Sequence, residues 1–232
     1  MSTVDQSPMS QIAKRRTAAA GAEADSTYGQ KREEILQAAA RVFLRTGYWS
    51  TKLSDVASEA GMDRASLYYY YGSKDDLFHD LSSRAVIGNI EATTELAEST
   101  SMTASEKLAK AIEILMVSFE ANYPYMYVLV REDVSRWEAE DLENNAWVEK
   151  VHNWSSTYVN LLRRIINEGI DTDEFTSPLP SGVLAHCLIG MLNYSYTWFQ
   201  PGGVLTAAEI AAGMSKLILA GLCAERVRQR HR

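Results

Sequence analysis

Nearly every periodic segment of this chain repeats its apolar residues at steps of three and four, the spacing of one face of an α-helix. Runs of alternating apolar and polar residues long enough to form strands do not occur in the sequence. The prolines fall mostly where the helical pattern breaks anyway, at Pro8, Pro124, Pro178, Pro180 and Pro201. The pattern therefore predicts an all-α fold.

The pattern also predicts where the helices lie. They are expected at about 31–45, 52–60, 64–71, 74–98, 104–121, 124–137, 144–169, 180–199 and 206–228. Residues 1–29 are rich in Ser, Ala and Thr and are expected to form a flexible N-terminal tail. The 232 residues are enough to bury a sizeable core.

The distribution of charge suggests a boundary near residue 78. A net charge of −7 would normally argue against nucleic-acid binding, which relies on Lys and Arg. Residues 1–30 and 31–78 are each neutral, however, and residues 79–232 hold 13 basic and 20 acidic residues. The sequence thus predicts an N-terminal domain over 30–78 and an acidic helical domain over 79–232.

Several classes of protein are disfavoured. No apolar run approaches the roughly 18 residues of a membrane span, and no signal-peptide core is present, so a cytoplasmic protein is expected. Cys187 and Cys223 lie in apolar helical patterns and are expected to be small buried thiols. The four histidines lack zinc-ligand spacing and no phosphate-binding glycine loop occurs, so we expect no metal, no cofactor, no catalytic residues and no enzymatic activity.

The most informative stretch runs from Thr51 to Lys74. Ala57 lies four residues before Gly61, where two steeply crossing helices would be closest and where a small residue and a positive-φ glycine are useful. This spacing is typical of a helix-turn-helix, whose second helix enters the DNA major groove. Alone it is a weak signal, because unrelated helices contain it often.

The residues after Gly61 strengthen that interpretation. Asp63 can cap the second helix, and Arg64 at its start has the side chain best suited to guanine acceptors. Four tyrosines follow at positions 68–71, and four consecutive residues sweep around every face of a helix. Some must therefore be buried, and others must expose a phenol that can contact phosphate or a thymine methyl.

These motifs resemble a known signature. Leu67-Tyr68-Tyr69-Tyr70-Tyr71 followed by Gly72-Ser73-Lys74-x-x-Leu77 is similar to the signature of the TetR family of bacterial transcriptional repressors, and the likeness runs from about Lys31 to Leu81. The resemblance implies an N-terminal three-helix domain with a helix-turn-helix, followed by an α-helical ligand-binding and dimerisation domain.

The resemblance also implies roles for single residues. Thr51 would cap the first helix of the motif and contact phosphate, and Leu67 and Tyr71 would be core, with Phe43 and Val56. The implied DNA-binding residues are Thr51, Arg64, Ala65, Ser66, Tyr68, Tyr69, Tyr70 and Lys74. Lys14, Arg15 and Arg16 have two interpretations, a solvated tail or an arm that reaches a neighbouring minor groove.

Aromatic stripes in the second domain suggest a ligand pocket. Most such stripes are core, but aromatic residues with polar atoms also suit an adaptable apolar pocket. The candidate lining residues are Phe119, Tyr123, Tyr127, Trp147, Trp154, Tyr158, Met191, Tyr194 and Trp198. The expected effector is a small, largely apolar molecule, lipid-derived or drug-like, with an acyl-CoA among the options.

The resemblance further implies a homodimer through the last two long helices, roughly 180–199 and 206–222. The function expected is a ligand-responsive regulator, usually a repressor, that binds a palindromic double-stranded operator and is released by its effector. Activation is also open. The alternative is an all-α apolar-ligand-binding or interaction module without DNA activity, against which the tyrosine run, Arg64 and Lys74 argue.

Overall fold

The computed structural model describes the backbone of residues 8–132 and 146–229, and within these ranges the side chains of residues 27–132, 149–151 and 153–222. Every regular element in this part of the chain is helical, which confirms the all-α fold. The elements are α1 (Pro8–Thr46), α2 (Leu53–Glu59), α3 (Arg64–Tyr70), α4 (Lys74–Glu98), α5 (Ala104–Ala121), α6 (Tyr125–Glu132), α7 (Ala146–Asp171), α8 (Ser181–Asn193), the 3₁₀ helix η3 (Tyr194–Thr197) and α9 (Ala207–Gln229).

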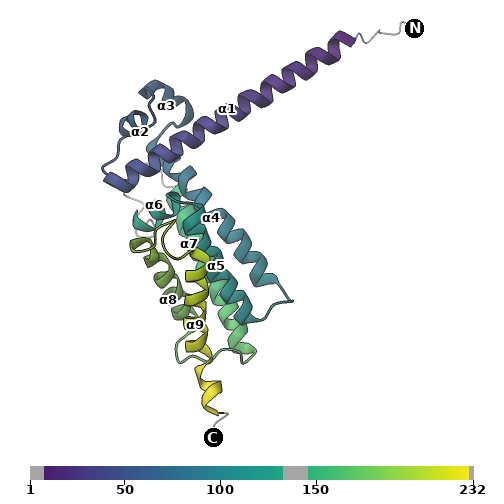
Figure 1. Cartoon of the computed structure of the whole chain (residues 1–232), viewed down its shortest axis with the longest axis vertical. Coiled ribbons are helices and arrows are strands. Elements are labelled where there is room, and N and C mark those ends of the chain that lie inside the picture. Colours follow the sequence, from purple (N-terminus) through teal and green to yellow (C-terminus); the bar gives the residue numbers. More distant parts are fainter. Residues whose placement is uncertain (1–7, 133–145, 230–232) are drawn as a thin grey trace, which may run out of the picture.

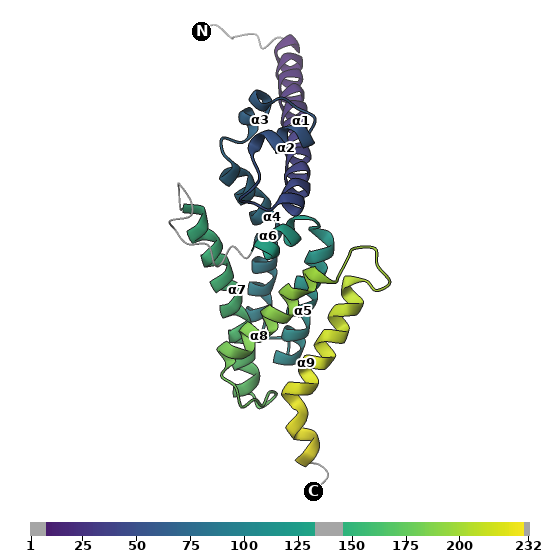
Figure 2. The ribbon, with the colours of Figure 1, turned by 90° about the vertical axis from the view of Figure 1, so that its left-hand side faces the viewer.

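The helices form two groups along the long axis of the molecule. Figure 1 shows α2 and α3 at one end, resting on α1, and α4 to α9 as a bundle below them. Within the bundle α9 packs on α5, and α7 packs between α4 and α8. Figure 2 shows α4 running from the α1–α3 group into the bundle. The expected boundary at residue 78 therefore lies inside a continuous helix.

The first helix is much longer than expected. α1 begins at Pro8, whereas the sequence predicted a flexible tail up to residue 29 and a helix from about Lys31. Proline is well tolerated in the first turn of a helix, because its missing N–H would have no helical partner there. No proline follows it before Thr46, and residues 18–24 are mostly alanine, the strongest helix former. Lys14, Arg15 and Arg16 lie on this extension, and their side chains are outside the described residues.

One hydrophobic cluster joins the two groups of helices. Phe43 of α1 is fully buried, with its ring 5.4 Å from that of Phe78 in α4 and 5.8 Å from that of Tyr48. Val56, Leu67 and Tyr71 are buried in the same cluster, as the sequence predicted. The cluster continues through α5, where Phe119 is fully buried, and into α7 and α9.

An ion pair with a buried lysine fixes α5 to α7. The side chain of Lys107 is 3% exposed, and its Nζ lies 2.7 Å from both carboxylate oxygens of Glu168. Removing the glutamate would leave the lysine charge buried and unpaired, which is costly. Cys187, by contrast, is exposed on α8, although its apolar neighbours predicted burial. α8 packs through the face that carries Ala185, Leu188 and Leu192, and Cys187 lies outside that face.

Gly169 allows the last turns of α7 to pack closely. A Cβ built on Gly169 would overlap the buried ring of Phe175, whose backbone N–H donates to the Gly169 carbonyl over 2.8 Å. We expect Gly169→Ala to lower the free energy of unfolding by about 1–3 kcal/mol, the usual cost of overpacking. Urea unfolding followed by circular dichroism measures this change.

Gly88→Ala is the matched control, since Gly88 is a helical glycine of α4 with open space around its Cβ position. Alanine is the better helix former by about 1 kcal/mol, so this variant should be as stable as the wild type or more so. Equal effects at the two positions would contradict the close approach of Phe175 to α7.

Candidate functional site

The turn between α2 and α3 has the predicted helix-turn-helix geometry. Gly61 has a φ of +65°, and the N–H of Met62 donates to the carbonyl of Ala57 over 3.0 Å. Ala57 is 2% exposed, so its small side chain is buried beside the turn. Asp63 caps α3, because its Oδ1 accepts from the N–H of Ser66 over 2.9 Å. The small residue, the glycine and the cap therefore do what the sequence predicted.

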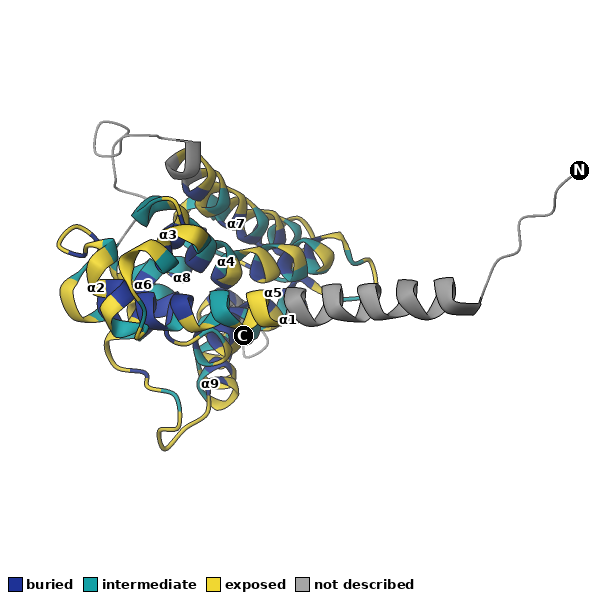
Figure 3. Cartoon of the chain, turned by 90° about the horizontal axis from the view of Figure 1, so that it is seen from above, coloured by how far each residue is buried: buried dark blue, intermediate teal, exposed yellow. Residues whose placement is uncertain are grey.

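α3 presents one face to solvent and buries another. Leu67 is fully buried and anchors the helix, and Tyr71 is buried just beyond its end. Arg64, Ala65, Tyr68 and Tyr69 are all exposed. Figure 3, which looks onto this end of the molecule, shows the exposed outer sides of α2 and α3. The tyrosine run is thus divided between core and surface, as predicted.

Arg64, at the start of α3, is oriented by contacts with Tyr68. Its guanidinium donates to the hydroxyl of Tyr68 over 3.1 Å and lies 5.3 Å from the centre of that ring. Only one nitrogen of the guanidinium is used in this bond, so the other donors remain directed to solvent. An arginine fork in this position can bind two acceptors of a guanine base at once.

Ser66 and Tyr70 are half-buried at the side of α3. The Ser66 hydroxyl donates to Oδ2 of Asp63 over 2.6 Å, and this bond lowers the pKa of the Asp63 carboxyl. Tyr70 stacks on Tyr28 of α1, with ring centres 5.0 Å apart. Both side chains therefore have partners within the domain while lying beside the exposed face.

The role of Thr51 in the structure differs from the predicted one. The N-cap of α2 is Lys52, whose N–H donates to Oδ2 of Asp55 over 2.9 Å. Thr51 is 3% exposed, and its hydroxyl donates to the carbonyl of Gly47 over 2.6 Å. The predicted capping role is wrong, because the helix begins one residue later. The buried hydroxyl also disfavours the implied phosphate contact.

Lys74 opens α4 as predicted, but its amine is directed inward. The Nζ donates to the carbonyl of Tyr48 over 2.8 Å and lies 4.1 Å from the centre of that ring. Burial lowers the pKa of Lys74. An ammonium has three donors, so a phosphate contact from the remaining ones stays a prediction.

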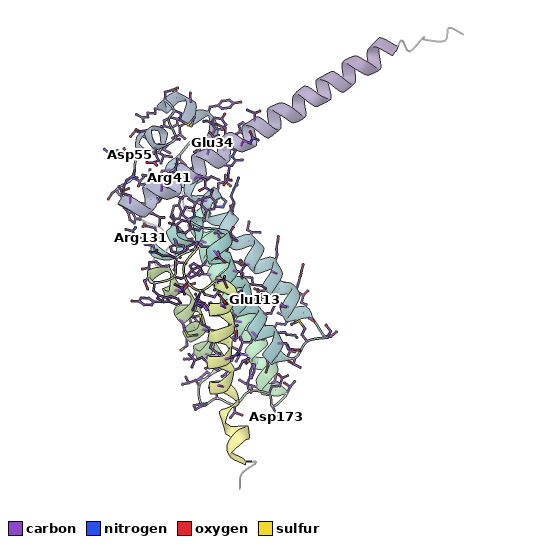
Figure 4. The ribbon with its side chains drawn as sticks, viewed as in Figure 1. Glu34, Arg41, Asp55, Glu113, Arg131 and Asp173 are labelled. Carbon is purple, nitrogen blue, oxygen red and sulfur yellow. The ribbon has the colours of Figure 1, made fainter. Side chains whose placement is uncertain are left out.

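Ion pairs and hydrogen bonds fasten the helix-turn-helix to α1. The carboxylate of Glu59, at the end of α2, accepts from Arg41 over 2.8 Å and from Arg45 over 3.1 Å. These two bonds lower the pKa of Glu59. Figure 4 labels Arg41 beside α2 and Arg131 at the end of α1, where Arg131 donates to the carbonyl of Leu44. α1 therefore contacts both the helix-turn-helix of α2 and α3 and helix α6.

A second polar cluster joins α1 to the body. Asp80 of α4 accepts from Arg32 over 2.5 Å and from the hydroxyl of Tyr71 over 2.6 Å. Next to it, Glu33 accepts from the hydroxyl of Tyr125 over 2.5 Å and also pairs with Arg84. α1, α4 and α6 thus meet through charge-assisted bonds, which are stronger than neutral ones.

A cavity of about 520 Å³ lies among α4, α5, α6, α7 and α8. This volume is within the range of small-molecule sites. Its lining residues are Val86, Asn89, Leu115, Met126, Leu129, Val130, Val151, Trp154, Ser155, Ser156, Tyr158, Val159, Asn160, His186, Ile189 and Asn193. None of these lining residues is Asp, Glu, Lys or Arg. The part of the wall that the structure describes is thus polar only through amide, hydroxyl, imidazole and indole groups.

Among the predicted pocket residues whose side chains are described, only Trp154 and Tyr158 line this cavity. Burial raises the pKa of Tyr158 to about 12. Of the others, Trp147 lies outside the described side chains. Met191 is half-buried but is not a lining residue.

The remaining five predicted pocket residues lie elsewhere. Phe119 and Tyr127 are core residues that contact each other edge to face, 5.9 Å apart. Tyr123, Tyr194 and Trp198 are 48%, 65% and 52% exposed. Sequence periodicity identified aromatic stripes, but it could not tell which stripe faces the cavity.

Two walls of the cavity, from α6 and α8, were not predicted from the sequence. Met126, Leu129 and Val130 form one wall, and His186, Ile189 and Asn193 form another. Their i, i+3 and i, i+4 spacing was visible in the sequence, and for His186 and Asn193 the signal was a polar residue on an otherwise apolar helix. These positions are mostly aliphatic or polar, whereas the predicted pocket residues are mostly aromatic.

His79 links α4 to the cavity wall. Its ring stacks on Trp154 with centres 5.6 Å apart. Burial lowers the pKa of His79, with Lys150 acting in the same direction, so the native state favours the neutral ring. The unfolded chain then takes up the proton first as the pH falls below about 6.5. The stabilising contribution of His79 is present above that pH and is lost below it.

We therefore expect acid to weaken the wild type more than a His79→Gln variant. The free energy of unfolding, measured by urea titration at pH 7.5 and pH 5.5, should fall further for the wild type between the two values. The same fall in both proteins would contradict the effect of burial on His79.

Among the described residues, no group of three or more His, Cys, Asp or Glu side chains could hold a metal ion. No helix within the described ranges is long and apolar enough to cross a membrane.

The exposed α3, the turn before it and the cavity in the body define the class of protein, a helix-turn-helix DNA-binding protein with a helical sensor-like body. Residues 35–81 match the family described as bacterial regulatory proteins, tetR family. Residues 101–222 match the tetracyclin repressor-like C-terminal domain. The chain therefore belongs to the tetR family and is a DNA-binding transcriptional regulator, as the motif resemblance predicted.

Individual relatives agree with this assignment. The HTH-type transcriptional repressor KstR2 of Mycobacterium tuberculosis is 24% identical over 198 residues, which cover 85% of this chain and 95% of that protein. The structure of this ketosteroid regulator has a TM-score of 0.73, covering 82% of this chain and 94% of the other at 21% identity. The regulator PfmR of Thermus thermophilus has a TM-score of 0.68 at 27% identity, covering 80% and 96%. AibR, solved with isovaleryl coenzyme A and operator DNA, has a TM-score of 0.66 at 20% identity, covering 81% and 97%.

Proposed function

We propose that this chain is a dimeric repressor that binds a palindromic operator through α3 and is released when a small apolar effector enters the cavity of the body. The observation that carries the proposal is the division of α3 into a buried anchor, Leu67, and an exposed face with Arg64 and two tyrosines. A helix fastened in this way can enter a major groove without losing its own packing.

Within the motif, Arg64, Ala65 and Tyr68 are proposed to face the bases. Arg64 reads guanine, and Ala65 offers only a methyl contact. Ser66, Tyr70 and Lys74 are proposed to contact the phosphate backbone, and Tyr69 to contact phosphate or a base. The few basic groups nearby imply that binding relies on two copies of the motif acting together.

The proposed dimer uses the outer faces of α8 and α9. Exposed apolar side chains on these elements include Val183 (45%) and Leu217 (70%). Gly190 and Gly213 have open space where a Cβ would lie, so a second pair of helices can approach closely there. Two copies would form a four-helix bundle related by a two-fold axis, which matches a palindromic operator.

The proposed effector is uncharged over the part that enters the cavity. A charged group there would lose part of its hydration, and no Asp, Glu, Lys or Arg is among the described residues that line the wall. A steroid ketone fits this description, and so does the acyl chain of a coenzyme A thioester whose phosphates stay outside. We choose these two classes as probes because KstR2 is described as a ketosteroid regulator and AibR was solved with isovaleryl coenzyme A.

The proposed coupling runs through α4 and α6. Val86 and Asn89 of α4 line the cavity. The same helix begins at Lys74, next to the helix-turn-helix. Met126 of α6 lines the cavity, and its neighbour Tyr125 bonds to Glu33 of α1. An effector that favours one arrangement of these helices would change the spacing of the two α3 helices and so lower operator affinity. Such a regulator would work in the cytoplasm, where the chromosomal operator lies.

Selection from random-sequence duplex DNA tests the proposal. The wild-type protein should enrich an inverted repeat, and isovaleryl coenzyme A or a ketosteroid should weaken the complex in fluorescence anisotropy. Failure to enrich any sequence would overturn the regulator and favour an apolar-ligand or interaction module without DNA activity. Enrichment with no response to any apolar probe would overturn the effector part alone.

A further inference from the structure

Tyr28 lies on α1 ahead of residues 35–81, the part that matches the N-terminal tetR family domain. Its ring nevertheless contacts two tyrosines of α3. It stacks on Tyr70 at 5.0 Å with 26° between the planes, and it meets Tyr69 edge to face at 6.1 Å. Tyr69 and Tyr70 also meet edge to face, at 5.2 Å. The three rings therefore form a closed group.

This tyrosine group lies beside the exposed face of α3 that is proposed to read DNA. Tyr69 is 75% exposed, more than either of its partners, and Tyr28 is 38% exposed. A cleft of about 500 Å³ beside the group is lined from α1 by Gln30, Lys31 and Glu34, and from the other side by Met62, Ser66 and Tyr69. Figures 1 and 2 show α1 continuing past α3 beyond this point. The α1 extension is thus a neighbour of the reading helix.

The contacts restrict a side chain that would otherwise be free. An exposed tyrosine such as Tyr69 samples several rotamers, and fixing one of them on DNA binding reduces affinity. Edge-to-face and offset-stacked rings are the favoured arrangements of aromatic pairs, so the group holds Tyr69 and Tyr70 in one orientation in the free protein. The side chains of Tyr69 and Tyr70 are then partly ordered before the operator binds.

We propose that Tyr28 is a positioning residue for operator recognition, which orients Tyr69 and Tyr70 of α3 before DNA binds. The inference rests on the proposed operator binding. It assigns to α1 a role in specificity that acts through α3 and needs no direct contact between Tyr28 and DNA.

The test compares Tyr28→Ala, Tyr28→Phe and the wild type on the operator selected by the wild-type protein, with dissociation constants from fluorescence anisotropy. We expect about a tenfold loss for Tyr28→Ala, because two side chains in each half-site lose their order. Tyr28→Phe should restore wild-type affinity, since phenylalanine keeps the ring that stacks on Tyr70 and meets Tyr69. Alanine is a better helix former than tyrosine, so α1 is not weakened by the substitution. Circular dichroism confirms equal helix content.

A double-mutant comparison separates positioning from direct contact. In a Tyr69→Ala/Tyr70→Ala background, adding Tyr28→Ala should change affinity less than twofold. Wild-type affinity in Tyr28→Ala, or a full tenfold loss that persists in the double background, would overturn the inference while leaving the proposed function intact. Absence of any operator for the wild type would overturn both.

Discussion

Replacing Leu217 with glutamate should separate the dimer and reduce operator affinity by about 100-fold or more. Leu217 is 70% exposed in one chain, on the outer face of α9 that is proposed to meet the partner. Two-fold symmetry would place the new carboxylate in the apolar interface twice, and burying a charge there is costly. A separated chain binds only one half-site and loses the gain of 10²–10⁴, in order of magnitude, that linkage of two sites provides.

Analytical ultracentrifugation and anisotropy at the same protein concentration measure the two effects together. Ile87→Glu is the matched control, because it places the same charge at a 43% exposed apolar position of α4. This control should remain dimeric and bind the operator normally. A Leu217→Glu protein that stays dimeric, or a monomer that binds as tightly as the wild type, would contradict the proposed assembly.

Replacing Arg64 with alanine should be the most damaging single change within α3. A bidentate arginine–guanine contact contributes about 1–3 kcal/mol of discrimination, and a dimer makes it twice, so affinity for the selected operator should fall by about 30-fold or more. Affinity for unrelated DNA should change much less, because phosphate contacts provide that binding. Arg64→Lys should recover little, since an ammonium lacks the planar fork.

Arg163→Ala removes another exposed guanidinium, from α7 and far from α3, and serves as the control. It should leave operator binding unchanged. Competition titrations with selected and scrambled duplexes distinguish the outcomes. An equal loss on both duplexes would show that Arg64 contacts phosphate and would contradict its reading role.

The parts of the fold that depend on neighbouring residues could be predicted from the sequence. The positive φ of Gly61, the Asp63 cap and the burial of Leu67 are local consequences of residue type and helical phase. Thr51 and Lys74 could not be placed in the same way, because their partners depend on how the Tyr48 loop folds back onto α4. Tyr48 lies 26 residues from Lys74 in the sequence, yet its carbonyl holds the lysine amine.

The residues that line the cavity could likewise be predicted only in part. Helical spacing indicated the apolar faces of α5 and α7, and Trp154 and Tyr158 do line the cavity. Phe119 has the same kind of spacing but is enclosed by Tyr127 and the core, because α5 lies at the centre of the bundle. Which apolar face meets a cavity is decided by packing between helices, and a single helix does not carry that information. The long α1 was not predicted for a different reason. Its first half is rich in Ser, Ala and Thr, a composition that indicated a flexible tail, yet alanine has the highest helix propensity of all residues.

Hydroxyl-radical footprinting of the wild-type protein on its selected duplex tests the central claim most directly. Two copies of α3 related by a two-fold axis should protect two symmetric tracts, with centres separated by about one helical turn or a whole multiple of it. Saturating effector should remove both tracts together. A single protected tract at full occupancy, or uniform protection along the duplex, would contradict a dimer that reads a palindrome through its helix-turn-helix.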